Sequence, residues 1–513
     1  MNRRPRKNRK DTNAEALIQG ESSTLDRRLF VAGGAVAAIG AVRLIGAMDE
    51  APVPVATTPS VPLTPVTTPE PYPVGLPVDP TEDVRYLSPY QFGMVDGAAD
   101  NTTAMQMLFD TMVLNPGARA VLPAGIINVT NLRIDYSGVE EQPTSGAPYG
   151  YAGPKIEGSS KRGTIIHQIE GTSGDLLTVQ GKTGIASGPA NNNKISGMSL
   201  SNLQLEGAST GGNGLYLRSI VDSNFDDLTI SNAGGSGLYL ARETFISGQV
   251  DEYFYGNRFS HVKLLANANW GVECSGTNAI ASSFYDCEAI GNAAGGYRLA
   301  PSGMIMVHCL AIGNGVDDVS ARGVLSLSNS NPLSTNNGLT LIGCRFEGNS
   351  GVGGYEVEIR SGSGHVITGA QFFATSGATM LGIGLDTNDD RMVRGLVVTG
   401  GYFAGDNRTG SQRVAVLGPR ASSTSFDNLG VDPNQFTVSG AELIDDDSRD
   451  LWVANPSAFR VSNDGAVVMS PLAQSLVAPD TGAALGVVTG NNGKQSLVVR
   501  FPSGSAQVIA SED

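Results

Sequence analysis

Five segments of this chain share one pattern: FDDLTISN at 225–232, FSHVKLLAN at 259–267, FYDCEAIGN at 284–292, MVHCLAIGN at 306–314 and LIGCRFEGN at 341–349. Each begins with an apolar residue, has a small, acidic or histidine residue two places later, and continues with another apolar residue. Such self-similarity indicates one structural unit that buries its apolar face only by stacking on its neighbours.

The third place of the pattern sets the period. With NLQLEG at 202, ITGAQFF at 367 and VTGGYFAG at 398 added, this place is occupied by Asn202, Asp227, His261, Asp286, His308, Gly343, Gly369 and Gly400. Successive members are 25, 34, 25, 22, 35, 26 and 31 residues apart. A period of 22 to 26 residues with longer members predicts a parallel β-helix in which some turns carry inserted loops.

The fourth place predicts the interior of the solenoid. It is occupied by Leu203, Leu228, Val262, Cys287, Cys309, Cys344, Ala370 and Gly401. Three cysteines therefore fall in one inward ladder, where we expect buried free thiols, although a disulfide between neighbouring coils is geometrically conceivable. Zinc is not indicated, because no paired CxxC or HxxxH spacing occurs. A column of asparagines predicts turns with stacked side-chain amides, at positions 232, 267, 292, 314 and 349.

Composition and charge exclude several classes of protein. The 513 residues include 66 Gly, 40% are hydrophobic and 16% are charged, which argues against both wholesale disorder and a helical bundle. The net charge is -15, and residues 1–28 carry +4 of it, so the remainder sums to -19. A body this negative repels nucleic acid. It also repels an anionic polysaccharide, unless a metal ion or a local basic groove intervenes.

The N-terminal 50 residues predict a targeting segment, either an export signal or a membrane anchor. Arg27 and Arg28 precede the apolar run 29–42 and resemble a twin-arginine export signal. The 14-residue run is shorter than the ~20 residues that span a bilayer, so export is expected and a retained N-terminal membrane anchor is the alternative. Residues 51–82 are rich in Pro and Thr and predict an extended spacer. The expected location is periplasmic, extracellular or on the cell surface.

The start of the folded body carries a family resemblance. FGMVDGAADNTTAMQ at 92–106, VLPAGIINV at 121–129 and KIEGSSKRGTIIH at 155–167 resemble the opening of the pectate-lyase-like superfamily. The resemblance implies an all-β fold, a right-handed single-stranded parallel β-helix over 83–410. It also implies a capping helix, with Asp100 or Asn101 as the N-cap, whose apolar residues plug the open end. Polysaccharide lyase or glycoside hydrolase activity is the enzymatic function that it implies.

The polygalacturonase version of that family is not indicated. Those enzymes carry NTD, DD, GHG and RIK motifs in that order. Here GSGH at 362–365 precedes Asp389 and Asp390, and no RIK follows. That catalytic set therefore does not transfer to this chain.

The third-place column also supplies the first candidate catalytic residues. Asp227, His261, Asp286 and His308 alternate acid and imidazole on successive coils. Projecting outward, neighbours would lie about 5 Å apart and the two carboxylates about 10 Å apart. This approaches the separation of about 6.5–9.5 Å in inverting glycosidases. Asp and His are equally the residues that a structural ladder at a turn edge would use, so both interpretations stand.

A long insertion, ETFISGQVDEYFYG at 243–256, supplies the second group of candidates. Glu243, Asp251 and Glu252 are candidate acid or base residues, and Tyr253 and Tyr255 are candidate platforms for sugar rings. Loops that lengthen one coil are commonly on the binding face of a solenoid. An ordinary solvated loop is the alternative.

A third cluster, Asp386, Asp389 and Asp390, has the carboxylates that Ca²⁺ prefers, and it could equally be a polar turn. Residues 411–513 predict a separate β region, in which SRDLWVANPSAFRVSNDGAVVM at 448–469 is hairpin-like. The final strands resemble those that associate chains in tail-fibre and tailspike proteins, which implies a homotrimer. Together these patterns predict an exported protein that binds and degrades a polysaccharide. A non-catalytic carbohydrate-binding or adhesion solenoid and a phage tailspike-like protein are the alternatives.

Overall fold

The structure is a computed structural model. It describes residues 86–139, 150–181, 194–241, 254–274, 279–315, 318–327, 338–351, 353–374, 378–385, 392–405, 413–422, 424–427 and 429–431, and short strands beyond them. The predicted signal or anchor and spacer, residues 1–82, lie outside this part of the chain.

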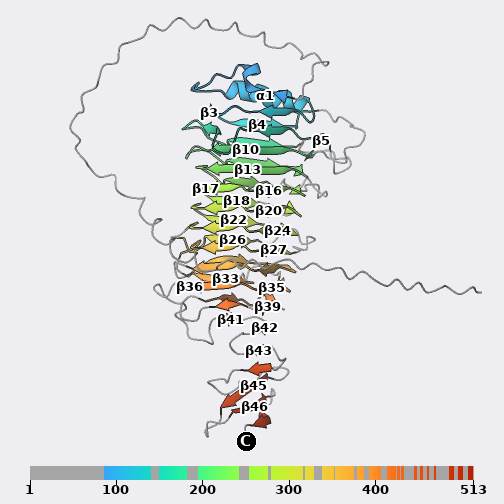
Figure 1. Ribbon diagram of the computed structural model, residues 1–513, viewed down its shortest axis with the longest axis vertical. Helices are drawn as coiled ribbons and strands as arrows, with labels where there is room; N and C mark the ends of the chain where they lie inside the picture. The colour runs from blue at the N-terminus through green and yellow to red at the C-terminus, as the bar shows by residue number, and fades with distance from the viewer. Residues whose placement is uncertain are drawn as a thin grey trace, which may run out of the picture. The chain divides into compact units, whose positions relative to one another are not determined.

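Parallel strands stack in register from coil to coil (Figure 1). One coil runs through β16 (Arg258–Ser260), β17 (Lys263–Leu265), β18 (Trp270–Cys274) and β19 (Ala279–Ile280) before the next begins at β20 (Ser283–Tyr285). This coil thus gives two strands to a large sheet A, one to sheet B and a short one to sheet C. Because connections between parallel strands are right-handed, this is the predicted right-handed parallel β-helix.

The strands of each sheet can be followed down the stack. The first strand of each coil in sheet A is β1 (Tyr86–Leu87), β2 (Arg119–Val121), β6 (Lys155–Glu157), β10 (Ser199–Glu206), β13 (Asn224–Ser231), β16, β20, β24 (Met304–Val307), β27 (Leu339–Ile342), β31 (Val366–Thr368), β35 (Val397–Thr399), β39 (Thr424–Asp427) and β42 (Leu451–Val453). The second is β3 (Gly125–Val129), β7 (Thr164–Gln168), the continuing parts of β10 and β13, β17, β21 (Glu288–Ile290), β25 (Leu310–Ile312), β28 (Arg345–Glu347), β32 (Gln371–Ala374), β36 (Tyr402–Gly405) and β40 (Gly430–Val431).

The other two faces of the coils are built from shorter series. Sheet B contains β4 (Leu132–Asp135), β8 (Leu177–Gln180), β11 (Leu215–Arg218), β14 (Leu238–Leu240), β18, β22 (Gly295–Leu299), β26 (Arg322–Ser326), β29 (Tyr355–Ile359), β33 (Thr379–Ile383), β37 (Ala415–Leu417) and β41 (Ile444–Asp446). Sheet C contains β5 (Tyr151–Ala152), β9 (Ile195–Ser196), β12 (Ile220–Val221), β15 (Phe254–Tyr255), β19 and β23 (Pro301–Ser302). A further short sheet is formed by β30 (Gly362–Ser363), β34 (Val393–Arg394) and β38 (Ala421–Ser422).

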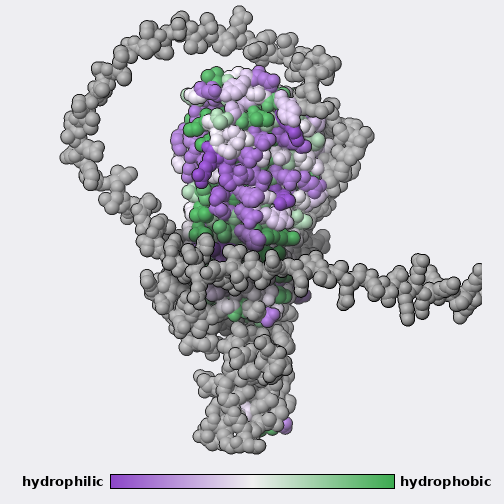
Figure 2. Space-filling view, viewed as in Figure 1, coloured by the Kyte–Doolittle hydropathy of each residue, from purple (hydrophilic) through white to green (hydrophobic). Residues whose placement is uncertain are grey.

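The strand register confirms the repeat alignment. Asn224 pairs with Arg258, Arg258 with Ser283, and Ser283 with Ile305, which reproduces the predicted spacings of 34, 25 and 22 residues. On the face drawn in Figure 2, hydrophilic residues cover most of the middle of the coloured surface, and hydrophobic residues show near its upper end and along its lower edge.

The N-terminal end of the stack is closed as predicted. Helix α1 (Thr102–Leu114) buries Met105, Leu108 and Phe109 completely. Its first turn is held by Asp100, whose Oδ1 accepts hydrogen bonds from the backbone nitrogen and hydroxyl of Thr102. The side chain of Asn101, the N-cap residue, instead bonds the backbone of Val95.

Parallel stacking continues past residue 410, where we expected the helix to end. Strand β37 pairs in parallel with β41, and β39 pairs in parallel with β42. The change to antiparallel pairing comes with the hairpin of β43 (Phe459–Val461) and β44 (Val467–Met469). Beyond it β45 (Ala484–Thr489), β46 (Gln495–Arg500) and β47 (Ala506–Ser511) form an antiparallel sheet.

Identical side chains stack inside the solenoid. The Phe225, Phe259 and Phe284 rings follow one another at 4.8 Å between centroids, close to the spacing of the strands that carry them. The predicted cysteine ladder is also confirmed, because Cys287, Cys309 and Cys344 are buried free thiols. Their Sγ atoms lie near backbone carbonyl oxygens of the same and the preceding coil.

A second ladder is formed by buried asparagines. Asn267 donates through Nδ2 to Oδ1 of Asn292 at 2.7 Å, Asn292 donates likewise to Asn314 at 2.8 Å, and Asn314 to Asn349 at 2.6 Å. The stacked amides were predicted correctly for these four residues. Asn232 was assigned to this column wrongly, because its unit is one residue shorter. It is exposed with φ 57°, and Ala233 occupies the ladder position.

The ladder ends at a buried carboxyl group. Asn349 donates through Nδ2 to Oε2 of Glu356 at 2.7 Å, and its backbone nitrogen donates to both Glu356 oxygens. Burial raises the pKa of Glu356 from 4.5 to about 7, against the lowering effect of these hydrogen bonds. The environment at the end of the ladder therefore favours the protonated form of the Glu356 carboxyl group.

This carboxyl group predicts a stability change with pH. The folded protein binds the Glu356 proton more tightly than the unfolded chain does. The contribution of this proton to the free energy of unfolding is therefore fully present below pH 4.5 and is lost as pH rises through about 7. At about 1.4 kcal/mol per pKa unit, this corresponds to about 3 kcal/mol. Glu356→Gln should flatten the change in unfolding midpoint between pH 5 and pH 8.

The surface variant Glu288→Gln serves as the control and should keep the wild-type dependence. Parallel pH profiles for wild type and Glu356→Gln, measured by urea unfolding, would contradict the assignment.

Candidate functional site

The corner between the two strands of sheet A is made by one residue per coil in the left-handed backbone region. Asp227, His261, Asp286 and His308 have φ of 50°, 54°, 51° and 52°. The same corner is made by Asn202 before them and by Gly343, Gly369 and Gly400 after them. Gly, Asn, Asp and His are the residues that adopt this conformation most readily. The column thus has a backbone role, as the structural interpretation proposed.

The polar side chains of this corner column face solvent. Those of His261, Asp286 and His308 are 57%, 53% and 65% exposed, whereas that of Asp227 is 32% exposed. A residue that turns the backbone here therefore also exposes its side chain on the surface.

Two carboxylate–imidazole pairs form across neighbouring coils. His261 Nδ1 lies 3.1 Å from Oδ1 of Asp226, and His308 Nδ1 lies 3.6 Å from Oδ1 of Asp286. Asp226 was not among the predicted residues. Its position was readable, because Phe225 points inward and residues alternate along a strand.

Asp227 has a different partner. The Lys161 ammonium group, from the loop between β6 and β7, contacts Asp227 Oδ1 at 2.5 Å. This loop lies two coils toward the N-terminus, whereas Asp286 is paired toward the C-terminus with His308. The four predicted residues therefore share one corner but do not form one group of contacts.

Cationic and aromatic side chains flank the pairs. The Arg258 guanidinium lies 4.8 Å from the centroid of the Tyr285 ring, and its Nε donates to Ser260 Oγ at 3.0 Å. On the other side of the corner, Lys263 donates to Glu288 Oε2 at 2.6 Å. Lys263 is thus neutralised by an acid of the next coil, whereas Arg258 contacts an aromatic ring and has no acidic partner among the described residues.

The carboxylate–imidazole pairs are suited to proton transfer. When Nδ1–H donates to a carboxylate, Nε2 is left as the basic nitrogen, and the carboxylate stabilises the imidazolium that forms on proton uptake. His261 and His308 are exposed enough for a ligand to reach Nε2. The His261–Asp226 pair, which is within hydrogen-bond distance, can therefore act as a general base and then as a general acid, whereas His308 and Asp286 at 3.6 Å make a looser charge contact.

Most of the other candidates fall outside the described residues. These are Glu243, Asp251, Glu252 and Tyr253 of the insertion, Asp386, Asp389 and Asp390 of the acidic cluster, and Arg27 and Arg28. Tyr255 is described, half-buried in β15 of sheet C, at the end of the coil that precedes the one with Arg258 and His261. Within the described part of the chain, no group of three or more His, Cys, Asp or Glu residues is arranged to hold a metal ion.

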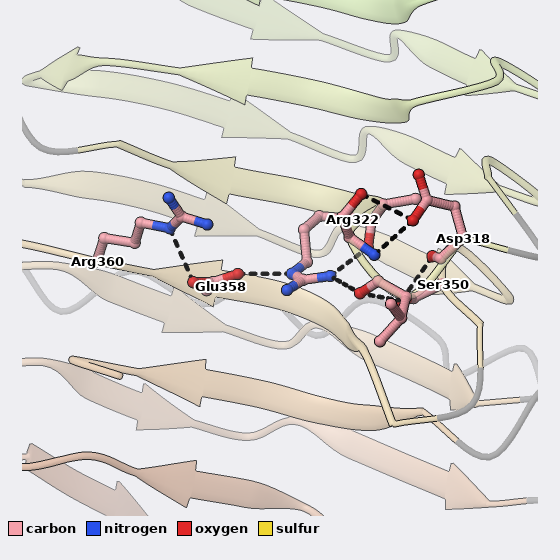
Figure 3. Close-up of polar contacts among 8 residues, drawn as sticks. Asp318, Arg322, Ser350, Glu358 and Arg360 are labelled. Carbon is pink, nitrogen blue, oxygen red and sulfur yellow. Dashed lines mark hydrogen bonds and ion pairs between the residues drawn. The ribbon is translucent and has the colours of Figure 1, made fainter. Parts of the chain in front are cut away.

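A charged network on sheet B was missed at the level of sequence (Figure 3). Glu358 on β29 accepts from Nε of Arg322 at 2.6 Å and from Nε of Arg360 at 2.8 Å. Arg322 also donates to backbone carbonyls of the turn that begins at Asp318. The Arg322 and Glu358 side chains are only 9% and 6% exposed, so this network holds coils together rather than meeting a ligand. The sequence feature that could have revealed this network is a charged residue within an otherwise apolar strand, as in YEVEI at 355–359.

His365 is likewise structural. Its Nδ1 accepts from the backbone nitrogen of Leu339 at 3.1 Å, and its Nε2 lies 3.1 Å from the carbonyl oxygen of Ser361. Burial lowers the pKa of His365 to about 4, so the imidazole is neutral at physiological pH. This agrees with the prediction that the polygalacturonase catalytic set does not transfer.

No protein-family model and no curated protein matches this chain. Several solved structures are similar to it at low sequence identity. The A-module of the mannuronan C-5 epimerase AlgE4 of Azotobacter vinelandii is 14% identical, with 72% of this chain and 97% of that one covered and a TM-score of 0.45. An alginate lyase of Paenibacillus sp. is 11% identical, with 72% and 99% covered and a TM-score of 0.40.

The tailspike gp49 of the Acinetobacter baumannii bacteriophage Fri1, described as a capsular polysaccharide depolymerase, is 13% identical, with 70% of this chain and 65% of that one covered and a TM-score of 0.41. The in-register parallel coils are the observation that decides the fold. The chain is therefore a parallel β-helix.

The position of His308 depends on a glycine in the next coil. A Cβ atom added to Gly343 would lie 2.7 Å from Cδ2 of the His308 ring, whereas one added to Gly369 would meet nothing closer than 3.9 Å. Their φ values are 60° and 62°, so an alanine is equally strained at both. Gly343→Ala should displace the imidazole, and Gly369→Ala should leave it in place.

Imidazole NMR spectra can test this, because the chain has only four histidines. The His308 resonances should move in Gly343→Ala alone. Equal changes in both variants would mean that backbone strain, rather than the ring contact, is responsible.

Proposed function

We propose that this protein binds and degrades a polysaccharide along the outer corner of sheet A. The observation that carries the proposal is the pair of exposed carboxylate–imidazole contacts, His261 with Asp226 and His308 with Asp286, on one straight corner. His261 and His308 are two coils apart, which is about 10 Å at the strand spacing. A linear sugar chain laid along the solenoid axis can reach both.

The pairs favour elimination over hydrolysis. A glycosidase needs two facing carboxyl groups, whereas the bases here are imidazoles, each with its own carboxylate. In elimination from a uronate, Nε2 takes the proton on C5 and the C4–O bond breaks. A C4=C5 double bond forms, and the leaving oxygen receives a proton. The Arg258 guanidinium beside His261 could neutralise the sugar carboxylate as charge develops on it.

A non-catalytic carbohydrate-binding or adhesion protein is the second candidate. It is favoured by the backbone role of the corner column, in which His308, Gly343, Gly369 and Gly400 all keep φ between 52° and 62°. Residues chosen to turn the chain need not carry a reaction. A tailspike-like protein is a separate alternative, in which the antiparallel C-terminal strands would join three copies.

Glycan cleavage separates the two candidates. Wild-type protein should release unsaturated products, read by ultraviolet absorbance, from at least one member of a polysaccharide panel. Reducing-end assays on the same samples would reveal hydrolysis. His261→Gln and His308→Gln should each lower the rate about 100-fold or more, because each removes a base. The control Lys263→Gln lies on the same coil as His261.

Binding of a glycan without cleavage by any assay would remove the enzymatic proposal and leave the second candidate. Activity that survives in both histidine variants would place the reaction elsewhere on the chain.

Export by a twin-arginine-like route is part of the same proposal, because a polysaccharide-degrading protein meets its substrate outside the cytoplasm. Among the described residues, no helix is long and apolar enough to cross a membrane. Replacing Arg27 and Arg28 by Lys should retain the protein in the cytoplasm. N-terminal sequencing of exported material would distinguish a cleaved signal from an anchor, since an intact Met1 is expected only for the anchor.

A further inference from the structure

One outward column of sheet A is basic in its N-terminal half. It begins with Tyr86, Arg119 and Lys155 on successive coils, continues through Ser199 and Asn224, and reaches Arg258, as the pairing register requires. The three cationic side chains are exposed. We refer to these six residues as the basic column.

The cations of this column lack acidic partners. Among the described residues, no carboxylate lies within ion-pairing distance of Arg119, Lys155 or Arg258. Elsewhere on sheet A the cations are paired, as Lys263 is with Glu288 and Arg345 with Glu347, both at 2.6 Å. In a chain of net charge -15, three cations left without an acid on one line are a local exception.

Arg119 and Lys155 also border a cavity of about 120 Å³ at the N-terminal end of the column. The Arg119 guanidinium lies 5.8 Å from the Tyr86 ring centroid, and its Nη1 donates to the Tyr86 hydroxyl at 3.2 Å. Glu157 also borders the cavity, but its Oε1 accepts from Asn202 at 3.2 Å. The guanidinium is thus held in place beside an ammonium, with most donors of both groups free for a ligand.

The Arg119 and Lys155 pair supplies the local basic groove that a protein of negative net charge needs in order to bind an acidic polysaccharide. A negative protein repels an acidic polysaccharide unless a local basic groove intervenes. Arg119 and Lys155 outweigh the single Glu157 carboxylate, so the charged side chains that border the cavity sum to a positive charge. They favour an anionic group through charge-assisted hydrogen bonds, and a guanidinium can hold a carboxylate or a sulfate with two parallel bonds.

We propose that the basic column is a subsite for an acidic glycan. Arg119 and Lys155 bind the carboxylate or sulfate group of one sugar in the cavity. Arg258 lies three strand spacings from Lys155, about 14 Å away, and binds an acidic group beside the His261 and Asp226 pair. The subsite rests on the proposed function, because it orients the same chain along the corner at which cleavage is proposed.

Binding of three polysaccharides tests the subsite. Polygalacturonate supplies carboxylates, dextran sulfate supplies sulfates, and dextran is the neutral counterpart of the latter. Titrations with wild type and the double variant Arg119→Gln/Lys155→Gln would be followed by calorimetry. The matched control Lys263→Gln/Arg345→Gln removes the same charge from the same sheet, but from paired cations.

We expect the wild type to bind at least one acidic probe and to bind dextran at least tenfold more weakly. Arg119→Gln/Lys155→Gln should weaken acidic binding about tenfold to 100-fold, and the control should change it less than threefold. The acidic probe that shows this difference identifies the anionic group as carboxylate or sulfate.

Equal weakening in both double variants would overturn the subsite, since overall charge would then explain it. Binding or cleavage of dextran alone would overturn the subsite and the elimination chemistry, and would leave only polysaccharide binding or hydrolysis at the corner. Failure of the wild type to bind or cleave any glycan of the wider panel would overturn the proposed function, and the subsite with it.

Discussion

Each coil from Asn202 to Gly400 turns through one left-handed residue between its two strands of sheet A, and the rest of the molecule depends on that turn. It keeps the coils in register, so that each inward residue meets its equivalent one strand spacing away. The turn restricts the corner mainly to Gly, Asn, Asp and His. Three of these four residue types carry polar side chains, and the turn directs them outward. A requirement of the backbone therefore places acids and imidazoles in a line on the surface.

The interior keeps that line straight. Phenylalanine rings at 4.8 Å and the amides of Asn267, Asn292, Asn314 and Asn349 repeat at the coil spacing. A change of register by one residue would break every link of the amide ladder, and buried amides without partners are costly. Sheet B contributes the network of Arg322, Glu358 and Arg360, which ties neighbouring coils from the outside. These contacts act on stability, and through it on the positions of the surface side chains.

Much of this was readable from the repeats. The period, the cysteine ladder and the outward direction of His261 and His308 follow from aligning units, because the alternation within one unit is local. The capping helix was implied by the family resemblance at 92–106. Asn232 was misplaced because its unit has eight residues where the others have nine. Asp226, Arg119 and Lys155 were missed because their neighbours are set by register across loops of differing length. No pattern within a single unit shows that Lys155 lies three coils from Arg258.

The position of a bound acidic oligosaccharide, seen by crystallography of the complex, tests the central claim most directly. We expect the sugar chain to lie on the outer face of sheet A, with acidic groups at Arg119, Lys155 and Arg258 and a sugar ring within hydrogen-bonding distance of His261 Nε2. A chain bound on sheet B, or one on sheet A that contacts none of these side chains, would contradict the claim.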